Sequence, residues 1–75
     1  MACIDDRGAL MPTARMVLKA LHTPRYPSDV ARLIGVPLFR VRSSLRELVD
    51  LGFLEQSEEA YKITQAGKEK LESSS

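Results

Sequence analysis

The chain has 75 residues, of which 44% are hydrophobic and 28% are charged, and its formal net charge is +1. A chain of this length forms a single domain, and the balance is typical of a globular protein rather than a disordered or coiled-coil one. The sequence has no run of about 18 apolar residues, so it offers no candidate membrane span. Asp5, Asp6 and Arg7 interrupt the N-terminus where a signal peptide needs an apolar segment, so we expect a cytoplasmic protein.

The reactive side chains argue against catalysis. Cys3 is the sole cysteine and His22 the sole histidine, so no Cys/His spacing resembles a zinc site. The two residues are far apart in the sequence and form no plausible nucleophile–base pair. We therefore expect no enzyme activity, metal, cofactor or small-molecule ligand, and we expect His22 to lie near the end of a helix.

Charge is distributed unevenly along the chain. All seven arginines precede Asp50, and residues 25–50 hold five of them against three acidic residues. Residues 51–75 hold five glutamates against three lysines, a net charge of −2. This polarity predicts that one face of the molecule suits phosphate.

A first helix is predicted over residues 12–22. Pro12 suits the first turn because its missing N–H would be unpaired there, and Thr23-Pro24 ends the helix because a residue before proline avoids the helical region. The side chains predicted to pack inward are Met16, Val17, Ala20 and Leu21.

Two further helices are predicted on either side of a short turn. Ser28 is the expected N-cap of a helix of about seven residues, and Gly35 suits a left-handed position at its end. After Val36, Pro37 can begin a third helix that Gly52 ends at about residue 51. The apolar face of the second helix comprises Val30, Ala31, Leu33 and Ile34, and that of the third comprises Val41, Leu45 and Leu48.

In the last third of the chain, the spacing of apolar residues changes from that of a helix to that of a strand. Residues 53–57 and 60–64 are predicted to be strands joined by Glu58-Glu59. Thr64 caps a last helix over 65–71, which Gly67 weakens. The predicted domain covers 12–72, after a partly flexible segment over 1–11 and before a frayed tail over 73–75.

This order of elements carries a resemblance to a known family. The stretch from Val30 to Leu54 resembles the winged helix-turn-helix of bacterial and archaeal transcriptional regulators of the MarR, ArsR and PadR type. The pattern Tyr61-x-Ile63-Thr64-x-x-Gly67-x-x-x-Leu71 is similar to their second wing strand and following helix, and the resemblance covers about residues 13–71. It implies an α+β winged-helix fold with a three-helix core, a C-terminal β-hairpin wing and a short last helix. It also implies a small prokaryotic transcriptional regulator that binds double-stranded DNA.

In these families the third helix lies in the major groove and its first turns face the bases. Guanidinium groups there can pair with guanine or hold a phosphate. The residues that the resemblance places at base edges are Leu38, Phe39, Arg40, Arg42 and Ser43. Those that it places near phosphates are Ser28, Arg46 and Lys62.

Two features depart from the family pattern and favour an alternative. Leu38 and Phe39 stand where DNA-reading members usually carry polar residues, so they suit a thymine methyl, another protein or the N-terminal segment of this chain. The hairpin is acidic, with Glu55, Glu58 and Glu59 where DNA binders place cations. The alternative is a winged-helix protein–protein interaction module within a larger transcription, replication or other assembly.

Self-association is a further hypothesis, because the chain is too short for the long helices through which fuller family members dimerise. A homodimer would need an interface, which we call the seam, built from apolar residues that the core does not use. The candidates are Ala9, Leu10, Met11, Met16 and Val49 or Leu51.

Overall fold

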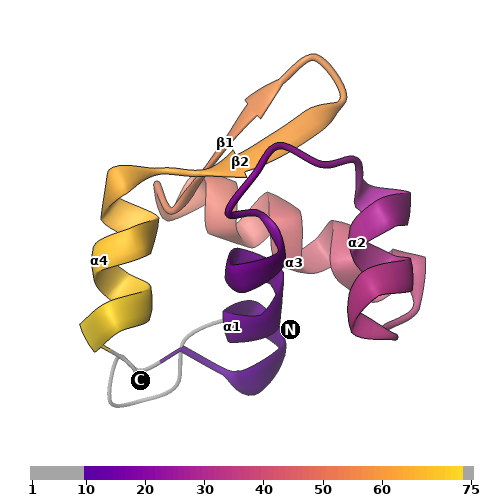
Figure 1. Cartoon of the computed structure of the whole chain (residues 1–75), viewed down its shortest axis with the longest axis horizontal. Helices are drawn as coiled ribbons and strands as arrows, with labels where there is room; N and C mark the ends of the chain where they lie inside the picture. Colours follow the sequence, from indigo (N-terminus) through magenta and orange to yellow (C-terminus); the bar gives the residue numbers. More distant parts are fainter. Residues whose placement is uncertain (1–9, 74–75) are drawn as a thin grey trace.

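The computed structural model describes residues 10–73, which form four helices and a two-stranded antiparallel sheet. This confirms an α+β architecture in the predicted order of elements. In chain order the elements are α1 (Pro12–Ala20), α2 (Pro27–Ile34), α3 (Leu38–Asp50), β1 (Leu54–Ser57), β2 (Ala60–Ile63) and α4 (Gln65–Ser73) (Figure 1). None of these four helices combines the length and the apolar character that crossing a bilayer demands.

Some of the expectations for the chain ends concern residues that the structure does not describe. Most of the N-terminal segment, including Cys3 and Ala9, lies outside the described residues, and so do Ser74 and Ser75. Ser73, expected in the tail, is the last residue of α4. Leu10 packs into the core with 4% of its surface exposed, so it adds nothing to an exposed seam.

The end of α1 differs from the prediction by two residues. The helix ends at Ala20 rather than at residue 22. The carbonyl oxygen of Leu21 accepts a hydrogen bond from the N–H of Ile63 at 3.0 Å, so the chain turns here to meet β2. A hydrogen bond between two residues that are far apart in the sequence therefore accompanies the end of α1.

The turn between α2 and α3 follows the prediction closely. Gly35 ends α2 in the left-handed conformation, with φ +70°, which glycine adopts without steric cost. Val36 and Pro37 complete the turn, and α3 starts at Leu38 with Pro37 in the N-cap position. Figure 1 shows this short turn joining the end of α2 to the start of α3.

The start of α2 corrects the prediction for Ser28. Pro27 occupies the first turn and Tyr26 is the N-cap, without a side-chain hydrogen bond. Proline at the first helical position needs no N–H partner, so the helix begins one residue before the predicted cap. Ser28 lies inside the first turn and is exposed.

The core is built mainly from α1 and α3. The predicted stripe of α3 is confirmed, because Val41, Leu45 and Leu48 are at most 1% exposed. Two predicted core residues are instead exposed: Met16 on α1 (39%) and Leu33 on α2 (59%). The rotation of each helix about its axis, which depends on its neighbours, directs other side chains inward. The buried apolar residues are Leu10, Ala14, Val17, Leu18, Ala20, Leu21, Val30, Val41, Leu45, Leu48, Leu54 and Ile63.

The hairpin is anchored at its base and paired with a third segment. Leu54 and Ile63 face each other in the register and are both buried. Arg25 forms an isolated bridge with Tyr61, through backbone hydrogen bonds of 3.1 and 2.9 Å. The segment before α2 therefore lies along β2 and holds the hairpin beside α2.

The last helix closes the core at the base of the hairpin. The hydroxyl of Thr64 accepts the N–H of Gly67 at 3.0 Å, which confirms Thr64 as the cap, and donates to the carbonyl oxygen of Gly52 at 2.7 Å. A Cβ at Gly67 would overlap the carbonyl oxygen of Phe53 and lie 2.8 Å from Cγ1 of Ile63. Glycine at this position thus permits the close approach of α4 to the hairpin.

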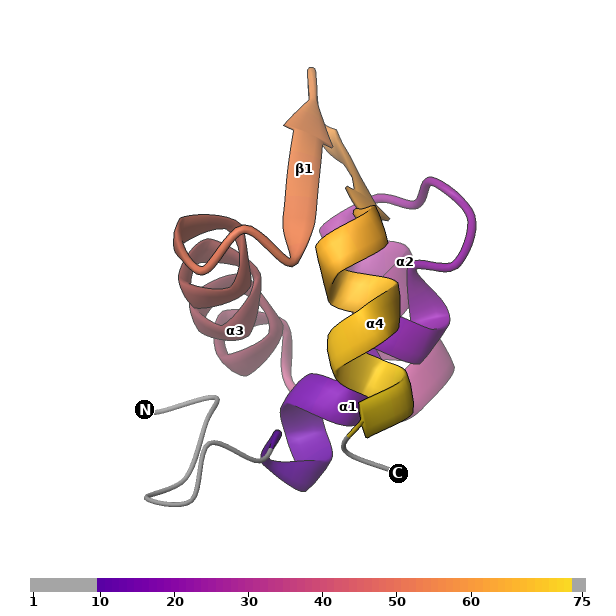
Figure 2. The ribbon, with the colours of Figure 1, turned by 90° about the vertical axis from the view of Figure 1, so that its left-hand side faces the viewer.

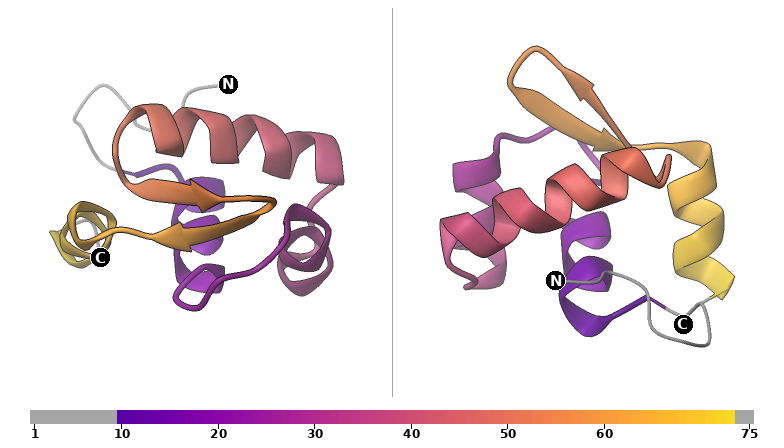
Figure 3. Two further views of the ribbon diagram at one scale, coloured as in Figure 1. Left: turned by 90° about the horizontal axis from the view of Figure 1, so that it is seen from above. Right: turned by 180° about the vertical axis from the view of Figure 1, so that it is seen from behind.

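The overall arrangement leaves α3 at one side of the molecule. Figure 2 shows α3 and α4 on opposite sides of the molecule, with the hairpin rising above the helices. Seen from behind, in the right panel of Figure 3, α3 crosses in front of α1 and α2. Among residues 10–73, the side of α3 that faces away from the core carries exposed residues from its first turn to its last.

Candidate functional site

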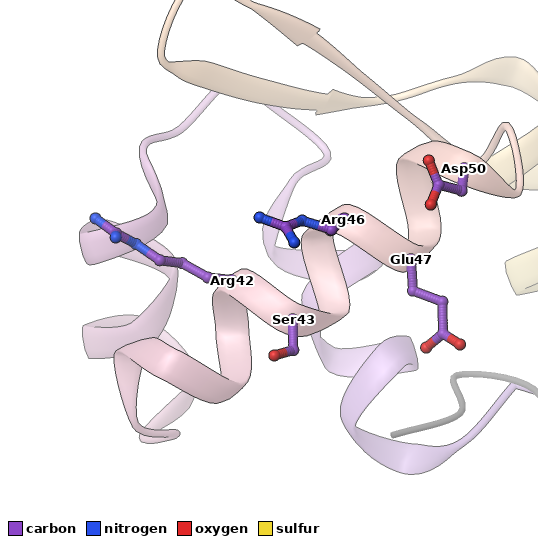
Figure 4. Close-up of a pocket in the computed structure, with 5 residues that line it drawn as sticks. All are labelled: Arg42, Ser43, Arg46, Glu47 and Asp50. Carbon is purple, nitrogen blue, oxygen red and sulfur yellow. The ribbon is translucent and has the colours of Figure 1, made fainter.

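The outward side of α3 carries a row of polar residues. Because an α-helix turns by about 100° per residue, positions that alternate with the buried stripe point away from the core. We call this row the outer face of α3. It borders a shallow hollow of about 300 Å³ and comprises Arg42, Ser43, Arg46, Glu47 and Asp50 (Figure 4).

Two arginines dominate the N-terminal half of this face. Arg42 and Arg46 are exposed and stand one helical turn apart. Within residues 10–73, neither forms a salt bridge. In Figure 4 both guanidinium groups extend in the same direction, away from Glu47 and Asp50. The face thus has a cationic end, whose donors are available to an anion, and an acidic end.

The same two arginines border a larger groove. It has a volume of about 560 Å³ and lies between the start of α2, the middle of α3 and one face of the hairpin. We call it the α3–hairpin groove. Its lining residues are Tyr26, Pro27, Ser28, Arg42, Arg46, Gln56, Glu59 and Tyr61.

Local structure explains how the hairpin contributes to this groove. Gln56 and Tyr61 are cross-strand partners, so their side chains share one face of the sheet. Glu55 and Lys62 form the next pair and lie on the opposite face. Arg25 holds Tyr61 in place through the backbone bridge, and the Nε of Arg25 donates to the Ala20 carbonyl oxygen at 2.9 Å.

The electrostatics of the groove are mixed. Arg42 and Arg46 face it from α3, and Glu59 faces it from the hairpin tip, without a salt bridge between them. Glu55, by contrast, lines a separate hollow together with Lys62. An anion that enters the groove therefore meets two cations on one side and one carboxylate on the other.

The structure brings together only part of the residue set named from the sequence. Ser28, Arg42 and Arg46 meet at the α3–hairpin groove, and Arg42, Arg46 and Ser43 share the outer face of α3. Lys62 lies on the other face of the hairpin and does not join them.

The three residues at the start of α3 point in different directions. Arg40 precedes Arg42 by two positions, which turns it to the other side of the helix by about 200°. Leu38 is 38% exposed and aligns with the buried Val41 and Leu45. Phe39 is 71% exposed and aligns with Ser43 and Arg46 on the outward side.

Several groove residues were not singled out from the sequence. Tyr26, Gln56 and Tyr61 come from segments that are distant in sequence. The alternation of the second strand placed Tyr61 and Lys62 on opposite faces, and the turn at Glu58-Glu59 makes Gln56 the partner of Tyr61. This register was the available signal; nothing in the sequence indicated that the segment before α2 lies beside them.

The chain matches no known family model, no curated protein and no solved structure.

Proposed function

We propose that this chain is a winged-helix protein that binds double-stranded DNA through α3, as a small transcriptional regulator of a prokaryotic cytoplasm. The observation that carries the proposal is the pair Arg42 and Arg46. Both are exposed, both extend in one direction, and neither forms a salt bridge within the described residues. The guanidinium groups of these two arginines can therefore donate hydrogen bonds to an external anion.

The chemistry of the outer face of α3 suits a duplex. A helix with its side chains is about 10–12 Å across, which matches a major groove about 12 Å wide. A guanidinium group can donate two parallel hydrogen bonds to guanine O6 and N7, or hold a phosphate. Ser43, between the two arginines, supplies a hydroxyl that can donate to or accept from a base edge.

The α3–hairpin groove suits the backbone that runs beside that major groove. Ser28 lies in the first turn of α2, where its own hydroxyl and the helix dipole favour a phosphate, and Arg32 pairs with the Asp29 carboxylate of the same turn at 3.8 Å. Glu59 repels phosphate on the hairpin side, so in this proposal the DNA backbone lies nearer to α2 and α3 than to the hairpin tip.

The test is a comparison of variants in duplex binding. We expect Arg42→Ala combined with Arg46→Ala to weaken binding to a labelled duplex about 100-fold at low salt, because each contact contributes about 1–3 kcal/mol. The matched control is Lys19→Ala combined with Lys68→Ala, which removes two charges from a hollow between α1 and α4. Equal losses in the two double variants would contradict the assignment of the site to α3.

Salt dependence provides the second readout. A protein that neutralises three phosphates loses about 40-fold in affinity between about 50 and 200 mM salt, because bound counterions are released. Circular dichroism of each variant establishes that the fold is intact. An affinity that does not change over this salt range would exclude binding through phosphates.

A protein-interaction module is the second candidate function. It is favoured by Phe39, which is 71% exposed at the start of α3, and by the acidic hairpin. Docking through apolar side chains depends weakly on salt, so the same titration separates this function from DNA binding.

A further inference from the structure

The side chain of Phe39 is the most exposed apolar group that the structure describes on α3. Its exposed fraction is 71%, against 38% for its neighbour Leu38. Leu38 aligns with the buried stripe of the helix, whereas Phe39 has turned fully outward. Burial of this ring against an apolar group of a ligand would be favourable, because it removes apolar surface from water.

The neighbours of Phe39 along the helix show what kind of ligand fits. Ser43 and Arg46 follow it at intervals of four and three residues, so the three side chains form one line on the outward side. A single apolar ring followed by a hydroxyl and a guanidinium matches a surface that is mostly polar and carries isolated methyl groups. The floor of the major groove has this composition, because thymine is the only base that carries a methyl group there.

The other exposed leucine nearby does not extend this apolar surface. Leu33 lies on the outward side of α2, in a hollow with Arg25, Asp29 and Arg32. Leu33 is therefore surrounded by charged side chains and belongs to a different helix face. A protein interface would need a contiguous apolar patch, and the line through Phe39 supplies one ring.

We infer that Phe39 contacts the C5-methyl group of a thymine when α3 lies in the major groove, so that this protein prefers sequences with a thymine at one fixed position. The inference rests on the proposed DNA binding and deepens it. Arg46 and Ser43, further along the same line, then face the base pairs that follow this thymine. Phe39 is thus a specificity-determining residue, whereas Arg42 and Arg46 supply most of the affinity.

The experiment replaces the methyl group by a hydrogen atom. The 75-residue chain is first used to select its preferred sequence from a pool of randomised duplexes. Each thymine of that sequence is then replaced in turn by deoxyuridine, which pairs in the same way but has no methyl group. We expect one position at which the change weakens binding about fourfold, the ratio for burying one methyl group.

The variant Phe39→Ala assigns the effect to this side chain. We expect Phe39→Ala to have the same affinity for the duplex with thymine at that position and for the duplex with deoxyuridine there. Its binding should still weaken as the salt concentration rises. Leu33→Ala is the control, and its affinities for the thymine and deoxyuridine duplexes should differ by the same ratio as those of the unsubstituted protein. Both side chains are exposed, so both variants should fold, which thermal melting by circular dichroism verifies.

Enrichment of no thymine, or a thymine preference that Phe39→Ala preserves or Leu33→Ala abolishes, would overturn the inference and leave DNA binding by α3 in place. Complete loss of duplex binding in Phe39→Ala would also overturn it, because one methyl contact cannot supply the whole affinity. If the unmodified protein binds no duplex at all, the proposed function itself fails.

Discussion

The outer face of α3 and the β-hairpin border the same groove, but they differ in charge and in attachment. The helix presents Arg42 and Arg46, whereas the hairpin presents Glu59. Four residues along α3 are buried, but β1 has a single buried residue at its base, and its other three are exposed. Segments with few buried contacts open at low free-energy cost. In the candidate site, α3 is therefore the firmly anchored border of the groove, and the hairpin is its less firmly anchored, acidic border.

The largest expected effect concerns the attachment of the hairpin. Gly67→Val should lower the free energy of unfolding by about 3 kcal/mol, because the added side chain meets the Phe53 carbonyl oxygen and Ile63. Urea denaturation followed by circular dichroism measures this change.

Ala66→Val serves as the control for Gly67→Val. It introduces the same residue at an exposed neighbouring position of α4. We expect a loss of about 0.5 kcal/mol, from helix propensity alone. Similar losses in the two variants would mean that α4 does not pack closely against the hairpin base.

A charge reversal at the hairpin tip tests its role at the groove. Glu59→Lys should raise duplex affinity about tenfold at low salt, because it removes one repulsion from phosphate and adds one attraction. Glu69→Lys makes the same change of charge on α4, outside the groove, and should raise affinity far less. Fluorescence anisotropy measures both, and equal gains would show that net charge alone controls binding.

The smallest expected effect concerns the opposite face of the hairpin. Lys62→Ala should change duplex affinity by less than about twofold, because Lys62 lies with Glu55 away from the α3–hairpin groove. The same anisotropy titration measures it. A tenfold loss of affinity would show that the DNA backbone reaches the hairpin face that carries Glu55 and Lys62, as the family resemblance implies.

The order of the elements and most of the core followed from the sequence. Val41, Leu45 and Leu48 recur at helical spacing, and Gly35 suits the left-handed turn before α3, so both features depend on residues that are close in the chain. The arginines of α3 were also predictable, since their positions on the helix follow from its period. These features are local, and local patterns encode them.

Other features depended on contacts between distant segments. The pairing of Leu21 with Ile63 ended α1 early, and the packing of each helix left Met16 and Leu33 exposed. The α3–hairpin groove requires Tyr26, Arg46 and Tyr61 from three separate parts of the chain. The sequence by itself determined which residues can carry charge or form a helix. Only the tertiary structure decided which of them share a surface, because that depends on how the elements pack against one another.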